Sequence, residues 1–188
     1  MAKEKPSSTA DPVVATLCPN CALCCNGVLF KDVELQKGDN ADKLKNLGLP
    51  ISNSRSALRG SGSKPSRFPQ PCSALEGCHC NVYADRPLRC RQFECALFKS
   101  VAVGETGVEG ALGIIRDARK RAERVKALLR ELGDSEESLA LSLRFKRARR
   151  RFENSDVDES TAETFSRLTL AVHDLNLLLH DKFYPPLS

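Results

Sequence analysis

Nine cysteines dominate the chemistry that this sequence of 188 residues could perform. All of them lie between residues 18 and 95, in two groups. The first group is Cys18-Pro-Asn-Cys21-Ala-Leu-Cys24-Cys25, and the second consists of Cys72, Cys78, Cys80, Cys90 and Cys95. Thiolates are soft ligands that suit zinc and iron–sulfur clusters. Because core packing gives no reason for such short intervals between cysteines, we expect metal ligation.

The first group sets a geometric requirement on any metal site. In a helix or a tight knuckle its four sulfur atoms would face the same side, over an arc of roughly 120°. Adjacent Cys24 and Cys25 still diverge by about 100°, so one tetrahedral ion cannot easily take both. We therefore expect two neighbouring ions, each bound by one member of the pair, or one polynuclear centre.

The second group supplies the complementary ligands. The four that complete a set of eight are Cys72, Cys80, Cys90 and Cys95. Eight thiolates fill two four-ligand ions or one polynuclear centre. Cys78 is then surplus, and His79 beside it is an alternative ligand.

Zinc is the metal that we expect, because it suits tetrahedral thiolate sites and needs no redox partner. Iron, or an iron–sulfur cluster, is the alternative. The ferredoxin spacing C-x2-C-x2-C-x3-C-P is not met, because Cys25 directly follows Cys24 and Asn26 stands where proline would follow. Spacing alone does not exclude iron.

Three arginines stand among the cysteines of the second group: Arg86, Arg89 and Arg91. Guanidinium groups near a thiolate site donate to sulfur, offset its charge and tune the metal. The alternative is that these arginines lie on the surface in water.

The formal net charge of +5 falls within the first hundred residues, while the later residues balance to zero. A cluster of thiolates would neutralise much of this excess, so we do not expect a nucleic-acid partner. The sequence contains no apolar stretch long enough for a membrane span, and residues 1–12 lack the apolar core of a secretory signal. These features, with so many thiols, indicate the reducing cytoplasm.

Several short motifs together resemble a known family. They are Cys18-x2-Cys21-x2-Cys24-Cys25, Pro71-Cys72, Cys80-Asn-Val-Tyr83, Arg86-Pro87 and Cys90-Arg91-Gln-Phe93-Glu-Cys95. The pattern resembles the CxxCxxCC family of YkgJ-like cysteine-cluster proteins, described as a zinc- or iron-chelating domain. The resemblance covers residues 16–100. It implies that the same eight cysteines bind metal, and that Tyr83, Arg86 and Arg91 lie around the site.

Some relatives in that family, the flagellin lysine methylases, couple such a cluster to protein methylation. The present sequence has no glycine-rich GxGxxG nucleotide motif, so this activity is only weakly implied. It also offers no nucleophile–base pair and no paired carboxylates. Whether the protein is an enzyme is left open.

The cysteine-rich half predicts short elements rather than a large sheet. We expect a flexible tail at 1–15, a cysteine-cluster domain at 16–100 and a loop at 52–70 that is rich in Ser, Gly, Pro and Arg. Alternating apolar residues at 28–35 predict a short strand or hairpin. A short helix is expected from Asp39, as its cap, to Leu47.

Residues 101–188 predict about three helices. Apolar residues recur every three or four positions after a capping box at Thr106–Glu109 and stop at Gly133. A second capping box, Asp134–Glu137, predicts a helix over 135–153, and a third helix is expected over 160–182. Short connections favour antiparallel packing. The expected fold is therefore mainly α, with a small irregular metal-stabilised domain packed on C-terminal antiparallel helices.

Two other groups of residues are candidate sites. His173 and His180 are nearly two helical turns apart, too far to share a metal ion, so surface or cap roles are expected. A basic run comprises Arg144, Lys146, Arg147, Arg149, Arg150 and Arg151. It could meet phosphate, RNA or an acidic protein, but a solvated helix end balanced by nearby acidic residues is favoured, since no aromatic residues interleave it.

The sequence therefore predicts a metal-binding protein that holds zinc or iron through clustered thiolates. The alternatives are an iron–sulfur redox or enzymatic protein, and a metal chaperone or interaction module that meets a protein partner through the basic run. Metal ions are the expected ligands, and no membrane partner is expected.

Overall fold

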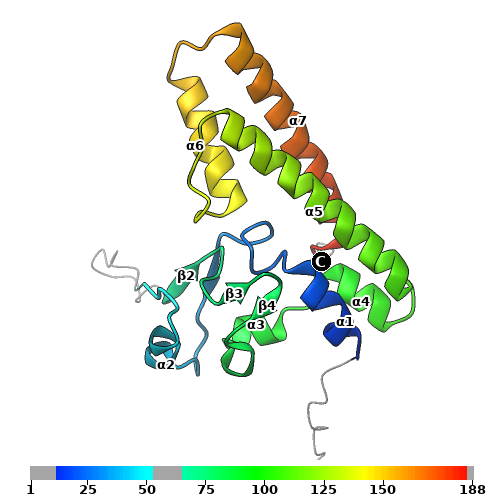
Figure 1. Ribbon diagram of the computed structural model, residues 1–188. Helices are drawn as coiled ribbons and strands as arrows, with labels where there is room; N and C mark the ends of the chain where they lie inside the picture. The colour runs from blue at the N-terminus through cyan, green and yellow to red at the C-terminus, as the bar shows by residue number, and fades with distance from the viewer. Residues whose placement is uncertain (1–11, 53–64, 186–188) are drawn as a thin grey trace, which may run out of the picture.

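The computed structural model describes residues 12–52 and 65–185 (Figure 1). In its first half, the elements are α1 (Pro12–Cys21), β1 (Asp32–Glu34), α2 (Ala41–Asn46), β2 (Arg67–Pro69), β3 (Leu75–Glu76), β4 (His79–Cys80), the 3-10 turn η1 (Tyr83–Asp85) and α3 (Leu88–Gln92). The elements that follow are α4 (Ala96–Ala102), α5 (Val108–Glu131), α6 (Leu141–Glu153) and α7 (Glu159–Lys182). The protein is mainly α, as the sequence predicted.

The two long helices α5 and α7 pack against each other in antiparallel orientation (Figure 1). Their apolar stripes supply most of one hydrophobic cluster, which we call the helical core. This core also takes in Leu17 and Leu23 around α1, and Leu97 and Val101 of α4. Among residues 12–52 and 65–185, no helix combines the length and apolar character that crossing a membrane requires.

A second, separate cluster holds together the part of the chain between α1 and α4. We call residues 32–52 and 65–92 the small lobe. Its buried apolar residues are Val33, Leu35, Leu44, Leu49, Phe68, Ala74 and Val82. Its two antiparallel strand pairs, β1–β2 and β3–β4, are very short. A core this small provides only modest hydrophobic stabilisation for the small lobe.

The predicted strand near residues 28–35 is present as β1, and its partner comes from the range predicted as a loop. Val33 pairs with Phe68 in β2, within the 52–70 range. Residues 53–64 of that range lie outside the described residues, as do residues 1–11 of the predicted tail. Helix α1 begins at Pro12, within the range predicted as a tail.

Two helix starts differ from the sequence prediction because the expected capping side chains bind elsewhere. Asn40, not Asp39, caps α2 and accepts from the backbone N–H of Lys43. The Asp39 carboxylate accepts instead from the N–H groups of Gln36 and Leu88, at 2.8 Å each. The capping box predicted at Thr106 is also wrong. Helix α5 begins after Gly107, and the Thr106 hydroxyl accepts from the Ser100 hydroxyl.

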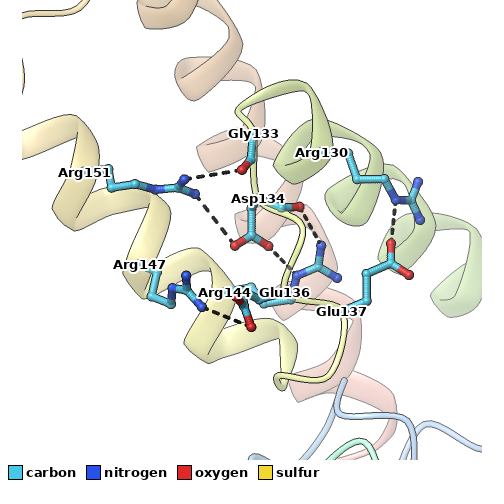
Figure 2. A network of polar contacts seen from close by, with 8 residues as sticks. All are labelled: Arg130, Gly133, Asp134, Glu136, Glu137, Arg144, Arg147 and Arg151. Atoms are coloured by element: carbon cyan, nitrogen blue, oxygen red, sulfur yellow. Dashed lines mark hydrogen bonds and ion pairs between the residues drawn. The ribbon is translucent and has the colours of Figure 1, made fainter.

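The largest difference concerns α6, which begins at Leu141 rather than near residue 135. Asp134, expected to cap it, is completely buried and accepts from Arg144 Nε at 2.6 Å (Figure 2). Because this buried ion pair uses the carboxylate, residues 135–139 are not helical and contain a turn at 137–138. The end of α5 near Gly133 and the bounds of α7 agree with the prediction within one or two residues.

Gly27 joins the cysteine-rich loop after α1 to the start of α6. Its φ is +80°, and a Cβ added there would lie 3.0 Å from Ala140 Cα and 3.2 Å from the ring of Pro71. Its carbonyl accepts from the Leu141 N–H at 2.9 Å. The start of α6 therefore lies against Gly27, which Pro71 also approaches closely.

Substituting Gly27 is expected to be unusually costly. Gly27→Ala should lower the free energy of unfolding by about 3 kcal/mol, since left-handed strain and overpacking add. Gly48→Ala is the matched control, because Gly48 also has a left-handed φ of +87° but nothing lies within 4 Å of its added Cβ. That control should lose only about 1 kcal/mol. Equal losses in urea unfolding would show that the close contact at Gly27 carries no cost.

Candidate metal centre

The local backbone separates the four cysteines of the first group. Helix α1 ends at Cys21, and Ala22 follows in a left-handed conformation with a φ of +56°. A tight turn then carries the next two cysteines, with the Cys25 N–H donating to the Ala22 carbonyl at 2.8 Å. The segment is therefore a helix end followed by a knuckle, and Cys24 and Cys25 have different neighbours.

One set of four thiols forms around Cys24. Burial raises the pKa of the Cys24 thiol well above its usual value, and the thiols of Cys21, Cys95 and Cys18 are among the neighbours that raise it further. Burial likewise raises the pKa of Cys21 to about 12, with Cys95 and Cys18 acting in the same direction. We call these four residues the first thiol set. Cys21, Cys24 and Cys95 pack against the helical core.

A second set forms around Cys25. Burial raises the pKa of Cys25 to about 12, and the thiols of Cys90, Cys72 and Cys80 are the largest neighbours that raise it further. Burial raises the pKa of Cys90 to about 11, again with Cys72 and Cys80 beside it. We call these four residues the second thiol set. Its three members from the later segment pack against the core of the small lobe.

The two sets meet at the adjacent residues Cys24 and Cys25. The Cys25 thiol also raises the pKa of Cys24, and the Cys18 thiol raises the pKa of Cys25. Each set thus takes one member of the adjacent pair and completes itself from the distant segment. All eight cysteines named from the sequence fall into the two sets.

Backbone hydrogen bonds hold the second set in place. The Cys72 N–H donates to the Cys25 carbonyl at 2.8 Å, which ties two of its members together directly. Cys80 lies on β4, opposite Leu75 of β3. Cys90 lies on α3, whose first N–H, at Leu88, donates to Asp39.

Helix α4 positions the remaining thiol of the first set. Cys95 is the N-cap of α4, and its Sγ accepts from the Phe98 N–H at 3.3 Å. Backbone N–H groups of this kind also lower the pKa of Cys95, although burial raises it more. Donation to sulfur stabilises a thiolate, so this geometry suits a ligand that is deprotonated when it binds a cation.

The surplus residues Cys78 and His79 have other partners among the described residues. Cys78 Sγ accepts from Arg119 Nη1 at 3.2 Å, and the same nitrogen donates to the Asn20 carbonyl at 2.9 Å. His79 is exposed on β4, opposite Glu76. Within the described residues, the contacts of Cys78 are thus with a helix of the helical core rather than with another thiol.

Arg86 lies beside both thiol sets. It lowers the pKa of Cys18 in the first set and of Cys90 in the second, although burial raises both more strongly. Its guanidinium stands 3.6 Å above the ring of Tyr83, and its Nε donates to the Tyr83 carbonyl at 3.0 Å. Arg89 and Arg91 are exposed on α3.

Two residues near the first set were not identified from the sequence. Arg119 of α5 lowers the pKa of Cys21, against the larger effect of burial. The Tyr184 hydroxyl donates to the Leu29 carbonyl at 2.9 Å, and burial together with Cys24 raises the pKa of Tyr184. Neither position carries a sequence signal, because both are brought to the cysteines only by the packing of distant helices.

The other sequence candidates lie elsewhere. His180 packs against the Tyr184 ring at 4.9 Å between centroids, and His173 is exposed on α7. In the basic run, Arg144 is buried, while Lys146, Arg147 and Arg150 are exposed on α6.

The donor chemistry of the two sets fits a soft cation. Four thiols per set match the ligand number and type of structural zinc or of an iron–sulfur cluster. Within residues 12–52 and 65–185, however, no three Cys, His, Asp or Glu side chains are already arranged to hold a metal ion. Binding would therefore require side-chain rotation within each set.

Comparison with known proteins identifies no relative. No protein-family model matches the sequence, and neither a curated protein nor a solved structure is significantly similar to it.

Proposed function

We propose that this protein binds two metal ions, one in each thiol set, and that the ions are zinc. The observation that supports the proposal is the grouping of eight thiols, from two distant segments, into two sets of four that divide between Cys24 and Cys25. Each set has the number and kind of ligands that tetrahedral zinc takes. Membership of the YkgJ-like cysteine-cluster family is part of this proposal.

The proposed role of the ions is to stabilise the fold of the small lobe. Three ligands of the second set pack against a core of only seven buried apolar residues. When bound, a cation supplies the charge that stabilises deprotonated thiols, and its binding free energy becomes folding free energy. Arg86, beside both sets, would offset the remaining negative charge.

The proposal includes a cytoplasmic location and leaves a protein partner open. Nine free cysteines persist as thiols only under reducing conditions. Metal ions are the ligands that the two sets require, whereas nothing in the thiol sets calls for a nucleic acid.

The number of bound ions should follow the division between the sets. Anaerobically purified protein should be colourless and contain two zinc ions per chain by elemental analysis. Cys21→Ser should remove the first ion and Cys90→Ser the second, so each variant should retain one. Cys78→Ser is the matched control and should retain both, because Cys78 contacts Arg119 instead.

Three results would contradict this assignment. A chain that stays free of metal after zinc is supplied would show that the thiols serve another purpose. Brown protein with visible absorption and acid-labile sulfide would favour the alternative, an iron–sulfur redox or enzymatic protein. Equal metal loss in Cys78→Ser would show that the ligand sets are assigned incorrectly.

A further inference from the structure

Helix α6 carries a dense run of positive charge. Its thirteen residues include six basic side chains and a single acidic one, Glu153. Figure 1 shows α6 at the outer edge of the helical part of the molecule, beside α5 and α7. Five of its basic side chains are exposed, and we call them the basic face: Lys146, Arg147, Arg149, Arg150 and Arg151.

The other side of α6 is fixed to the helical core. Ala148 belongs to that core, and Arg144 pairs with buried Asp134. Phe152 stacks on Phe165 of α7 with 4.1 Å between ring centroids. No thiol of either set takes part in these contacts, so the core holds the basic face in place whether or not an ion is bound.

Acidic neighbours neutralise only part of the basic face. Arg149 Nε lies 2.7 Å from a carboxylate oxygen of Glu153. Arg147 and Arg151 reach toward the segment 133–137, but their ion pairs there measure 3.8 and 3.7 Å (Figure 2). The side chains of these three arginines remain between 45% and 63% exposed, so much of their charge faces water.

Lys146 and Arg150 have no ion-pair partner among the described residues. They are exposed and stand one helical turn apart. The nearby carboxylate of Asp158 does not balance them, because it accepts from the Thr161 N–H and caps α7. Like charges at this spacing destabilise a helix, so an opposite charge supplied from outside would be stabilising here.

We propose that the basic face of α6 is a docking site for an acidic segment of another protein. This inference goes beyond metal binding and needs no ion in either thiol set. Lys146 and Arg150 form one row of charge along the helix, and Arg147 and Arg151 form a second. A partner with carboxylates about one helical turn apart would pair with both rows, and charge complementarity of this kind gives specificity.

The partner is a protein rather than a nucleic acid because α6 offers bases nothing to stack on. The two aromatic residues of α6, Phe145 and Phe152, both stack on Phe165 of α7 inside the molecule. Binding of single strands depends on exposed aromatic side chains as well as positive charge. Carboxylates need only the positive charge.

Fluorescence anisotropy of a labelled oligo-glutamate peptide, titrated with the full chain at about 0.15 M salt, tests the site. The double variant Lys146→Glu/Arg150→Glu should raise the Kd at least about tenfold, since attraction becomes repulsion. Lys120→Glu/Arg124→Glu on α5 is the matched control, with the same residue types, spacing and change in net charge. Lys120 and Arg124 are also exposed, and neither makes an ion pair with a described residue. This control should change the Kd by less than about threefold, because salt screens distant charges.

A neutral variant guards against effects of the new carboxylates on folding. Lys146→Gln/Arg150→Gln should weaken peptide binding in the same direction by a smaller factor. Equal weakening in the α5 control, or no binding of the peptide by the unaltered chain, would overturn the docking site. Tighter binding of a single-stranded RNA of equal charge would overturn the choice of a protein partner. Zinc content is measured separately, so peptide binding by a chain that takes up no zinc would contradict only the proposed function.

Discussion

Stripping the metal from this protein is expected to unfold the small lobe and leave the helical core folded. The small lobe buries only seven apolar residues, and three cysteines of the second thiol set pack against them. Structural zinc contributes on the order of 10–16 kcal/mol in small domains, about as much as burying seven apolar side chains does before the entropy of ordering the chain is subtracted. The lobe should therefore lose its structure when the ion is removed.

The helical core does not depend on the ions to the same degree. Its buried residues extend along α5 and α7, and they include parts of α1 and α4 on the other side of the cysteine groups. The boundary between metal-dependent and metal-independent structure should thus follow the two cores rather than residue 100. Segments around Leu23 and Leu97 should remain protected.

Peptide-level hydrogen exchange with and without a strong chelator measures this difference. Peptides from 32–52 and 65–92 should exchange fully in the chelator, while peptides from α5 and α7 keep their protection. Cys90→Ser should reproduce the loss without chelator, and Cys78→Ser should not. An unchanged small lobe after confirmed metal removal would contradict the prediction.

Arg144→Ala is expected to destabilise the helical part of the protein by about 3–5 kcal/mol, because it leaves a buried charge without its partner. The Arg144 side chain is 2% exposed and the Asp134 side chain 0%. The second oxygen of that carboxylate accepts no hydrogen bond within the described residues, and Arg151 Nη2 lies 3.7 Å from it. Figure 2 shows how Arg144 and Arg151 approach the carboxylate from α6.

An exposed pair on the same helix is the matched control. Arg149 Nε lies 2.7 Å from Glu153, but both side chains are at least half exposed. Arg149→Ala should therefore cost less than about 1 kcal/mol in urea unfolding. If both variants lose the same free energy, the buried pair does not stabilise α6 as described. An Asp134→Leu/Arg144→Met double variant should recover much of the loss, since an apolar pair leaves no buried charge unpaired.

The helix bounds illustrate what sequence patterns can predict. The apolar stripes of α5 and α7 repeat every three or four residues over more than twenty positions, so their existence and ends were predicted closely. The caps were predicted less well because they depend on single side chains with competing partners. Asp134 looked like a cap, but an arginine ten residues later takes its carboxylate.

Strand β2 illustrates the opposite case. Arg67–Pro69 lies in a stretch rich in Ser, Gly and Arg, with no alternating pattern, and it was predicted as loop. Its pairing with β1 buries Phe68, and Arg67 forms ion pairs with Asp32 and Glu34. A strand of three residues has too little local pattern to be recognised before its partner is known.

The candidate metal centre was likewise predictable from the sequence only in part. The spacing of the cysteines by itself predicted the eight candidate ligands and the divergence of Cys24 from Cys25, because helix and turn geometry separate adjacent side chains. Which distant thiols join each of them was decided only by the tertiary structure. Cys95 reaches the first set because α4 packs on the helical core, and Cys90 reaches the second because α3 packs on the small lobe. Contacts between distant segments depend on the packing of whole elements, which no local pattern specifies.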